Sequence, residues 1–182
     1  MLDMLQKSSV YKTTEMFFNN SSTKFYLMDL SRRTGIAHTS IKQNLNYLVK
    51  LKIINLQKEK KGKRIFPFYQ ANLENKQFKR YKLVHNIRSI LESELVDFIE
   101  KKLTPKSMVL FGSYSRGEDI ETSDIDLFVE CKKEELNLNH FEKKLGRKIE
   151  LHFKEDFTLY PKELKNNIIN GITLSGFLEG YK

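Results

Sequence analysis

Residues 107–130 read SMVLFGSYSRGEDIETSDIDLFVE, and this stretch decides how the C-terminal half of the chain folds. Its first part, residues 108–111, is a short apolar run that predicts a buried strand, and the glycine and serine that follow predict a sharp turn. In residues 123–129 acidic and apolar residues alternate. A strand there would place Asp124 and Asp126 on one face and apolar residues on the other. We therefore expect two carboxylates side by side above an apolar floor.

A third predicted strand, residues 149–153 (IELHF), repeats this alternation and places Glu150 and His152 on one face. Neighbouring carboxylates repel each other unless a cation lies between them, and a hard divalent ion with oxygen ligands is the usual solution. Glu150 is the natural third carboxylate, whereas His152 either lines the site or packs as an uncharged residue. The alternative for the two aspartates is an exposed strand edge, where acidic residues discourage aggregation.

Gly112-Ser113-x-x-x-Gly117, followed by Ser123-Asp124-x-Asp126, resembles the signature of the DNA polymerase β-type nucleotidyltransferase superfamily, in particular its minimal branch. Residues 159–172 are similar to the closing helix and glycine turn of minimal members, so the resemblance covers about residues 105–178. It implies an α/β domain with a mixed sheet that binds two Mg²⁺ ions. The catalytic and metal-binding residues implied are Asp124, Asp126 and Glu150, and the nucleotide-binding residues implied are Gly112, Ser113, Gly117 and Ser123.

The function that this resemblance implies is an enzyme that transfers a nucleoside monophosphate from a nucleoside triphosphate, such as ATP, to a hydroxyl group. Two other functions fit the same residues. One is a DNA-binding transcriptional regulator whose transferase domain senses nucleotide or is inactive. The other is an antitoxin-like partner of a helical HEPN-type toxin, because minimal members are often paired with such proteins.

Positive charge is concentrated in the N-terminal part of the chain. Residues 1–75 contain 13 Lys and Arg against five Asp and Glu, whereas residues 76–182 contain 19 against 18. This distribution favours a polyanionic partner for the first part, and nucleic acid is the partner that we expect.

The order of predicted elements in this basic part is helix, helix, turn, helix and hairpin. Helices are expected at residues 8–19, at 28–34 and from about 38, where Ile41, Leu45 and Leu48 form an apolar stripe. Strands at 53–56 and 64–69 would flank a basic loop, residues 58–63. The arrangement resembles a winged helix-turn-helix domain, whose third helix enters the major groove of double-stranded DNA. The residues then expected to contact DNA are Thr39, Ser40, Lys42, Gln43, Asn46, Lys60, Lys61, Lys63 and Arg64. The alternative is a protein-docking module with a solvated polar face.

The whole chain is thus predicted to be an α+β protein with three parts: an N-terminal winged helix-turn-helix domain at 1–74, a long linker helix at 75–104 and a nucleotidyltransferase domain at 105–182. The linker helix could also support a homodimer. The N-terminal sequence MLDMLQKSSVYKT does not read as a secretory signal, no apolar run is long enough for a membrane span, and the single Cys131 suits a reducing compartment. We therefore expect a cytoplasmic protein without a membrane partner.

Overall fold

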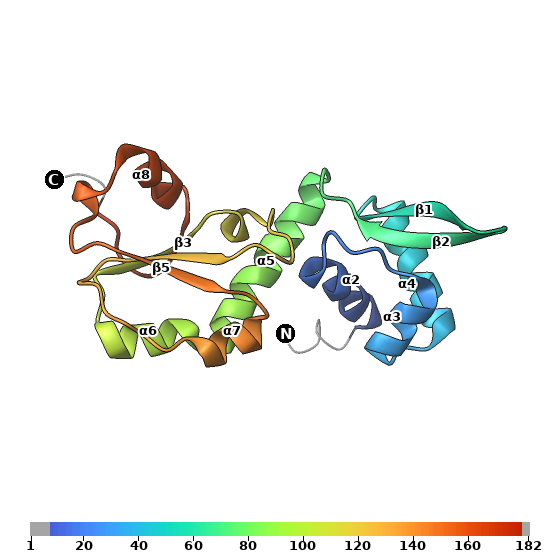
Figure 1. The fold of residues 1–182 in the computed structure, drawn as a ribbon, viewed down its shortest axis with the longest axis horizontal. Coiled ribbons are helices and arrows are strands. Elements are labelled where there is room, and N and C mark those ends of the chain that lie inside the picture. Colours follow the sequence, from blue (N-terminus) through green and yellow to red (C-terminus); the bar gives the residue numbers. More distant parts are fainter. Residues whose placement is uncertain (1–7, 180–182) are drawn as a thin grey trace. The chain divides into compact units, whose positions relative to one another are not determined.

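The computed structural model describes residues 8–179, and the chain divides into two compact units, residues 1–79 and 80–182 (Figure 1). Residues 1–7 and 180–182, which the expected domain limits include, lie outside the described part. The boundary between the units falls within helix α5 (Lys76–Ser93). Each unit has its own hydrophobic core and is described separately below.

The first unit contains three helices, α2 (Ser9–Asn19), α3 (Leu27–Thr34) and α4 (His38–Lys50). These match the three helices expected from the sequence. In α4 the predicted stripe of Ile41, Leu45 and Leu48 is buried in the core of the unit. Helix α4 begins at His38 after Ala37, without a side-chain capping bond.

A hairpin of β1 (Ile54–Lys61) and β2 (Arg64–Ala71) follows α4. The strands are antiparallel, with Lys61 opposite Arg64, so only residues 62–63 turn. Most of the expected basic loop at 58–63 is therefore strand. The cause is that backbone pairing continues beyond the apolar residues from which the strand ends were inferred. Phe25 forms an isolated antiparallel bridge with Tyr69 of β2.

One continuous helix was expected over residues 75–104, and this prediction was wrong. The structure has α5 and a second helix, α6 (Leu95–Leu103), separated at Glu94, whose φ is 67°. The last carbonyls of α5, those of residues 92 and 93, accept hydrogen bonds from the Lys144 ammonium group at 2.9 and 3.3 Å. The apolar spacing continues through the break, so the sequence pattern did not reveal this contact between distant residues.

The second unit contains a four-stranded mixed sheet with the order β5-β4-β3-β6. Strand β3 (Ser107–Phe111) is antiparallel to β4 (Ile125–Val129) and to β6 (Ile172–Gly176), whereas β4 and β5 (Ile149–Phe153) run parallel. Strands β3, β4 and β5 lie where the sequence predicted them, and β6 was not anticipated. The parallel pair matters for the site, because it brings residues 126 and 150 opposite each other.

Helices cover both faces of this sheet, as Figure 1 shows. One face packs on α5, α6 and α7 (Asn139–Leu145), and its core includes Ile90, Ile99 and Phe141. The other face packs on the short helix η2 (Phe157–Leu159) and on α8 (Lys162–Ile169), through Phe157 and Ile168. Helix α8 is the closing helix expected within residues 159–172.

No helix within residues 8–179 combines the length and the apolar composition needed to cross a lipid bilayer.

Candidate functional site

Strand register places the predicted acidic residues on one face of the sheet. In the parallel pair β4 and β5, Asp126 lies opposite Glu150 and Phe128 lies opposite His152. The alternating residues of β4, Ile125, Leu127 and Val129, are buried in the core on the other face. The period of two along each strand therefore directs the polar side chains to the face that carries η2 and α8.

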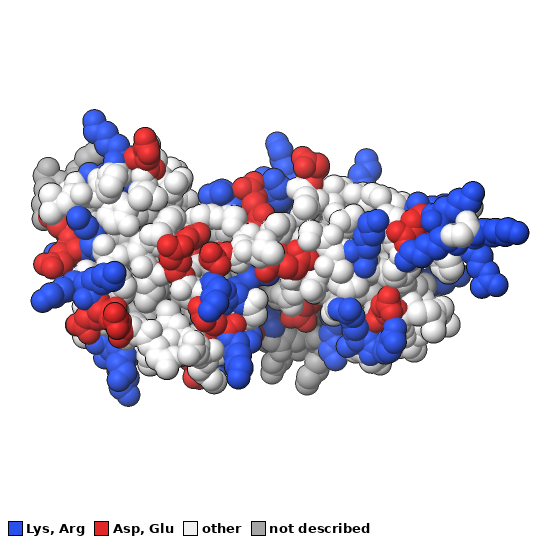
Figure 2. All heavy atoms as spheres, in the orientation of Figure 1, with Lys and Arg blue, Asp and Glu red and all other residues white. Residues whose placement is uncertain are grey.

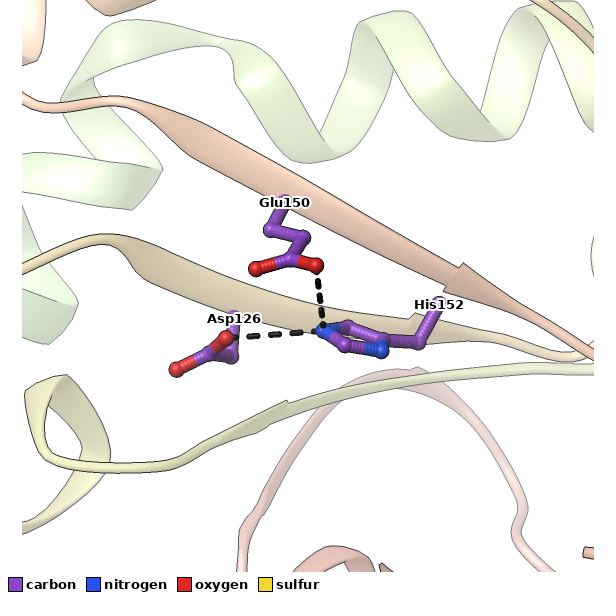
Figure 3. A group of neighbouring side chains, drawn as sticks. All are labelled: Asp126, Glu150 and His152. Carbon is purple, nitrogen blue, oxygen red and sulfur yellow. Dashed lines mark ion pairs between the residues drawn. The ribbon is translucent and has the colours of Figure 1, made fainter.

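Asp126, Glu150 and His152 form a compact cluster, in which one potential ligand atom from each residue lies within 4.8 Å of the other two (Figure 3). The His152 Nε2 atom is 3.4 Å from Asp126 Oδ1 and 3.9 Å from Glu150 Oε1. This nitrogen is buried and, within the part of the chain that the structure describes, makes no hydrogen bond of good geometry. Two carboxylates and a buried nitrogen that converge in this way can bind a divalent cation.

The electrostatics of Asp126 fit such a site. Its pKa is raised above the ordinary value, chiefly because the carboxyl is partly buried; nearby His152 opposes this shift, while the charges of Glu150 and Asp124 add to it. The ionised form of Asp126 is therefore costly in the metal-free protein, and a bound cation would relieve that cost. Glu150 is more accessible, with 60% of its side chain exposed compared with 25% for Asp126.

Asp124 lies at the edge of this arrangement. It is exposed, immediately precedes β4 and is not a member of the compact cluster, although its charge contributes to the raised pKa of Asp126. His152 is a member, and the sequence had left open whether this residue lines the site or packs. Its pairing with Asp126 depends on the parallel register of β4 and β5. The alternating sequence pattern alone does not determine that register.

The Gly112-Ser113 turn lies directly against the cluster. It follows the last residue of β3, Phe111, which pairs with Asp126. Gly112 has a φ of 73°, and a Cβ atom at this position would lie 2.3 Å from Asp126 Oδ2. Only glycine allows this backbone conformation together with such a close approach. The sequence-predicted turn and the sequence-predicted carboxylate are thus adjacent in the structure.

The chain after this turn forms one 3₁₀ turn, η1 (Tyr114–Arg116), which ends at Gly117 with a φ of 66°. Ser113, which directly precedes this 3₁₀ turn, is partly exposed. Ser123 has a different local role, because its Oγ accepts a hydrogen bond from the Ile120 backbone N–H at 3.0 Å and closes the loop before β4. An open hollow of about 770 Å³ borders Ser123 and Asp124, with Lys143 and Lys148 also in its lining.

In the first unit, the residues expected to contact DNA lie on two surfaces. On α4, Thr39, Lys42, Gln43 and Asn46 are exposed and Ser40 is partly exposed. On the hairpin, Lys60, Lys61, Lys63 and Arg64 are exposed. Figure 2 shows Lys and Arg side chains gathered over the tip of this hairpin. A protruding basic hairpin is the kind of surface that attracts a polyanion.

The charge of Lys61 on the hairpin is already paired within the first unit. Its Nζ lies 2.7 Å from Glu59 Oε1 and donates to the Tyr26 hydroxyl at 2.6 Å. Hydrogen bonding to Lys61 and then to Tyr26 lowers the pKa of Glu59 to about 2. Lys61 therefore helps to connect β1 with the start of α3, a contact that the sequence did not predict.

Comparisons with known proteins concern the second unit. A family model described as a nucleotidyltransferase domain matches residues 92–174, a region that contains β3, β4, β5 and the acidic cluster. The chain is also similar to two proteins of Methanocaldococcus jannaschii, each named a putative protein adenylyltransferase. With one it shares 39% identity over 82 residues, covering 41% of this chain and 81% of the relative. With the other it shares 40% identity over 63 residues, covering 35% of this chain and 72% of the relative.

Proposed function

Because this chain belongs to the nucleotidyltransferase family and is a transferase, we propose that it moves a nucleoside monophosphate from a nucleoside triphosphate to a hydroxyl group in a Mg²⁺-dependent reaction. The observation that carries this proposal is the convergence of Asp126, Glu150 and His152 beside the Gly112 turn. That arrangement combines a site for divalent cations with a partly exposed glycine turn, whose backbone can approach a polyphosphate closely.

The donor atoms of the cluster fit Mg²⁺ through their oxygens. Mg²⁺ prefers oxygen ligands, so we assign Asp126 and Glu150 as ligands and Asp124 as a third from the start of β4. Imidazole is more typical of zinc and other transition metals. His152 is accordingly assigned to hold the Asp126 carboxylate in place, as residues that contact metal ligands without binding the metal commonly do. Bound Mg²⁺, for which we expect two ions, would supply charge stabilisation at the phosphoryl oxygens.

The remaining chemistry is assigned to the side chains and backbone of this chain. The Gly112-Ser113 turn holds the β and γ phosphates and places the α phosphorus near Asp126. Glu150, the most exposed residue of the cluster, helps to take the proton of the acceptor hydroxyl. The hydroxyl oxygen then bonds to the α phosphorus, the bond from that phosphorus to the bridging oxygen breaks, and pyrophosphate leaves.

The names of the two archaeal relatives favour ATP as the donor and a protein hydroxyl as the acceptor. The test is to incubate the protein with Mg²⁺, each labelled nucleoside triphosphate in turn, and candidate acceptors that include proteins. We expect release of pyrophosphate and a nucleotide label on the acceptor, both lost in Asp126→Asn. Equal activity of the wild type and Asp126→Asn would refute the proposal.

For the first unit, we propose a winged helix-turn-helix that binds double-stranded DNA. The order α2-α3-α4-β1-β2, the exposed polar face of α4 and the basic hairpin support this assignment. Binding of duplex DNA should weaken steeply as salt increases, because lysine contacts to phosphates release counterions. DNA binding without detectable transfer would instead favour the nucleotide-sensing regulator, and copurification with a helical toxin would favour the antitoxin-like role.

A further inference from the structure

The second unit contains a buried charged cluster centred on Asp119, in the chain that follows the Gly112-Ser113 turn. The side chains of Lys82 and Asp119 are 0% and 1% exposed, and that of Arg147 is 8% exposed. Lys82 Nζ lies 3.2 Å from Asp119 Oδ2, and Arg147 Nη2 lies 3.4 Å from the same oxygen. Lys82 also donates a hydrogen bond to the Asp119 backbone carbonyl. One carboxylate therefore faces two buried cations.

Asn86 connects this cluster to the predicted nucleotide-binding turn. Its Nδ2 atom donates to Asp119 Oδ1 at 2.8 Å and to the Tyr114 backbone carbonyl at 2.9 Å. Tyr114 begins the 3₁₀ turn that directly follows Gly112 and Ser113. Side chains from two successive turns of α5, at residues 82 and 86, thus hold both ends of the segment 114–119.

The same carboxylate also contacts the chain just before β5. Arg147 lies in the short connection between α7 and β5, three positions before Glu150. Asp119 therefore links α5, the chain after the Gly-Ser turn and the chain that leads to the third carboxylate. These are the segments whose relative positions set the distance from the turn to the acidic cluster.

Stability alone is a poor explanation for this arrangement. Removing charges from water is costly, and a buried ion pair is often no more stabilising than apolar residues of similar volume. Burial lowers the pKa of Lys82, although Asp119 opposes this shift. Costly polar networks of this kind commonly fix the geometry of a functional site.

We propose that Asp119, Lys82 and Asn86 are positioning residues that hold the Gly112-Ser113 turn in the geometry needed for the triphosphate. This inference rests on the proposed nucleotidyltransferase function. None of the three residues touches the reacting atoms. They act through the backbone of residues 113–118, which they fix against α5.

Two variants separate the effect of the Asn86 hydrogen bonds from the effect of the Asp119 charge. Asn86→Ala removes both hydrogen bonds of the amide group and leaves the charges intact. Asp119→Asn removes the carboxylate charge that the two cations share. The matched control is Glu118→Gln in the same segment, because Glu118 pairs at 2.9 Å with Arg116, whose side chain is 53% exposed. Exposed pairs of this kind contribute little.

The first measurement is amide hydrogen exchange of residues 113–118 at a temperature where each variant is folded by circular dichroism. We expect exchange in this segment to be at least about tenfold faster in Asn86→Ala, because this variant loses one to two of the hydrogen bonds that hold the segment. Glu118→Gln should match the wild type within about twofold. This readout needs no turnover, so it decides the inference even if the wild type transfers no nucleotide and the proposed function fails.

The second measurement is steady-state kinetics with ATP and the acceptor that the labelling assay identifies. A displaced turn should raise the KM for ATP by about tenfold in Asn86→Ala and leave the KM for the acceptor unchanged. A merely structural role would lower the active fraction and change neither KM. Unchanged exchange in residues 113–118 together with an unchanged KM for ATP would overturn the inference. If Asp119→Asn does not fold, Asn86→Ala decides the outcome.

Discussion

Replacement of Gly112 by alanine tests whether the turn and the acidic cluster form one site. A Cβ atom at this position would lie 2.3 Å from Asp126 Oδ2. Ordinary contacts between carbon and oxygen are about 3.3 Å or longer, so the carboxylate must retreat by about 1 Å. A displacement of about 1 Å in a catalytic group can reduce the rate by about 100-fold. We therefore expect Gly112→Ala to lower kcat/KM by about that factor.

The matched control is Gly146→Ala. Gly146 has a φ of 65°, close to the 73° of Gly112, but a Cβ atom added there would meet nothing within 4 Å. Both variants should lose about 1–2 kcal/mol of unfolding free energy, because alanine is strained in the left-handed region. Only Gly112→Ala should also lose activity, since only there does the new methyl group push against a metal ligand.

The assays are chemical denaturation for stability, labelled-nucleotide transfer for activity and the increase in melting temperature on addition of Mg²⁺ for metal binding. The wild type and Gly146→Ala should be stabilised by Mg²⁺, and Gly112→Ala much less, because ligand binding to the folded state raises its stability. Activity of Gly112→Ala within about threefold of Gly146→Ala would show that the turn and Asp126 do not act together, and would refute this reasoning.

Three further predictions follow from the charges of the described residues. The pKa of Asp126 is raised, so its ionised form opposes folding as pH rises through that pKa; metal-free Asp126→Asn should therefore unfold at a higher temperature than the wild type at pH 7. Burial lowers the pKa of His85 from 6.5 to about 4, so folding favours its neutral form. As the pH is lowered through that window, the stability of the wild type should therefore decrease more steeply than that of His85→Gln. Replacing Lys60, Lys63 and Arg64 together by alanine should reduce the slope of log affinity for DNA against log salt by about 3, measured by fluorescence titration, and an unchanged slope would exclude phosphate contacts from the hairpin.

The sequence by itself determined the strands that carry the acidic residues. Alternation along β4 and β5 has a period of two and depends only on the local geometry of an extended chain. It therefore placed Asp126 and Glu150 on the polar faces of their strands, and the glycine and serine after β3 predicted the turn. The helices and the hairpin of the first unit were predicted for the same reason, since their apolar spacing, turn residues and basic residues are local features.

Only the tertiary structure decided how these local pieces meet. Register between β4 and β5 brought His152 to Asp126, and alternation within one strand does not specify its partner. Asp124 precedes β4 and lies outside the compact cluster. The break between α5 and α6 lies beside Lys144, a residue distant in sequence. No sequence pattern singled out Asp119, yet it is buried with cations that come from α5 and from the connection just before β5. Pairings over such separations depend on packing of the whole unit, and a local sequence pattern cannot encode them.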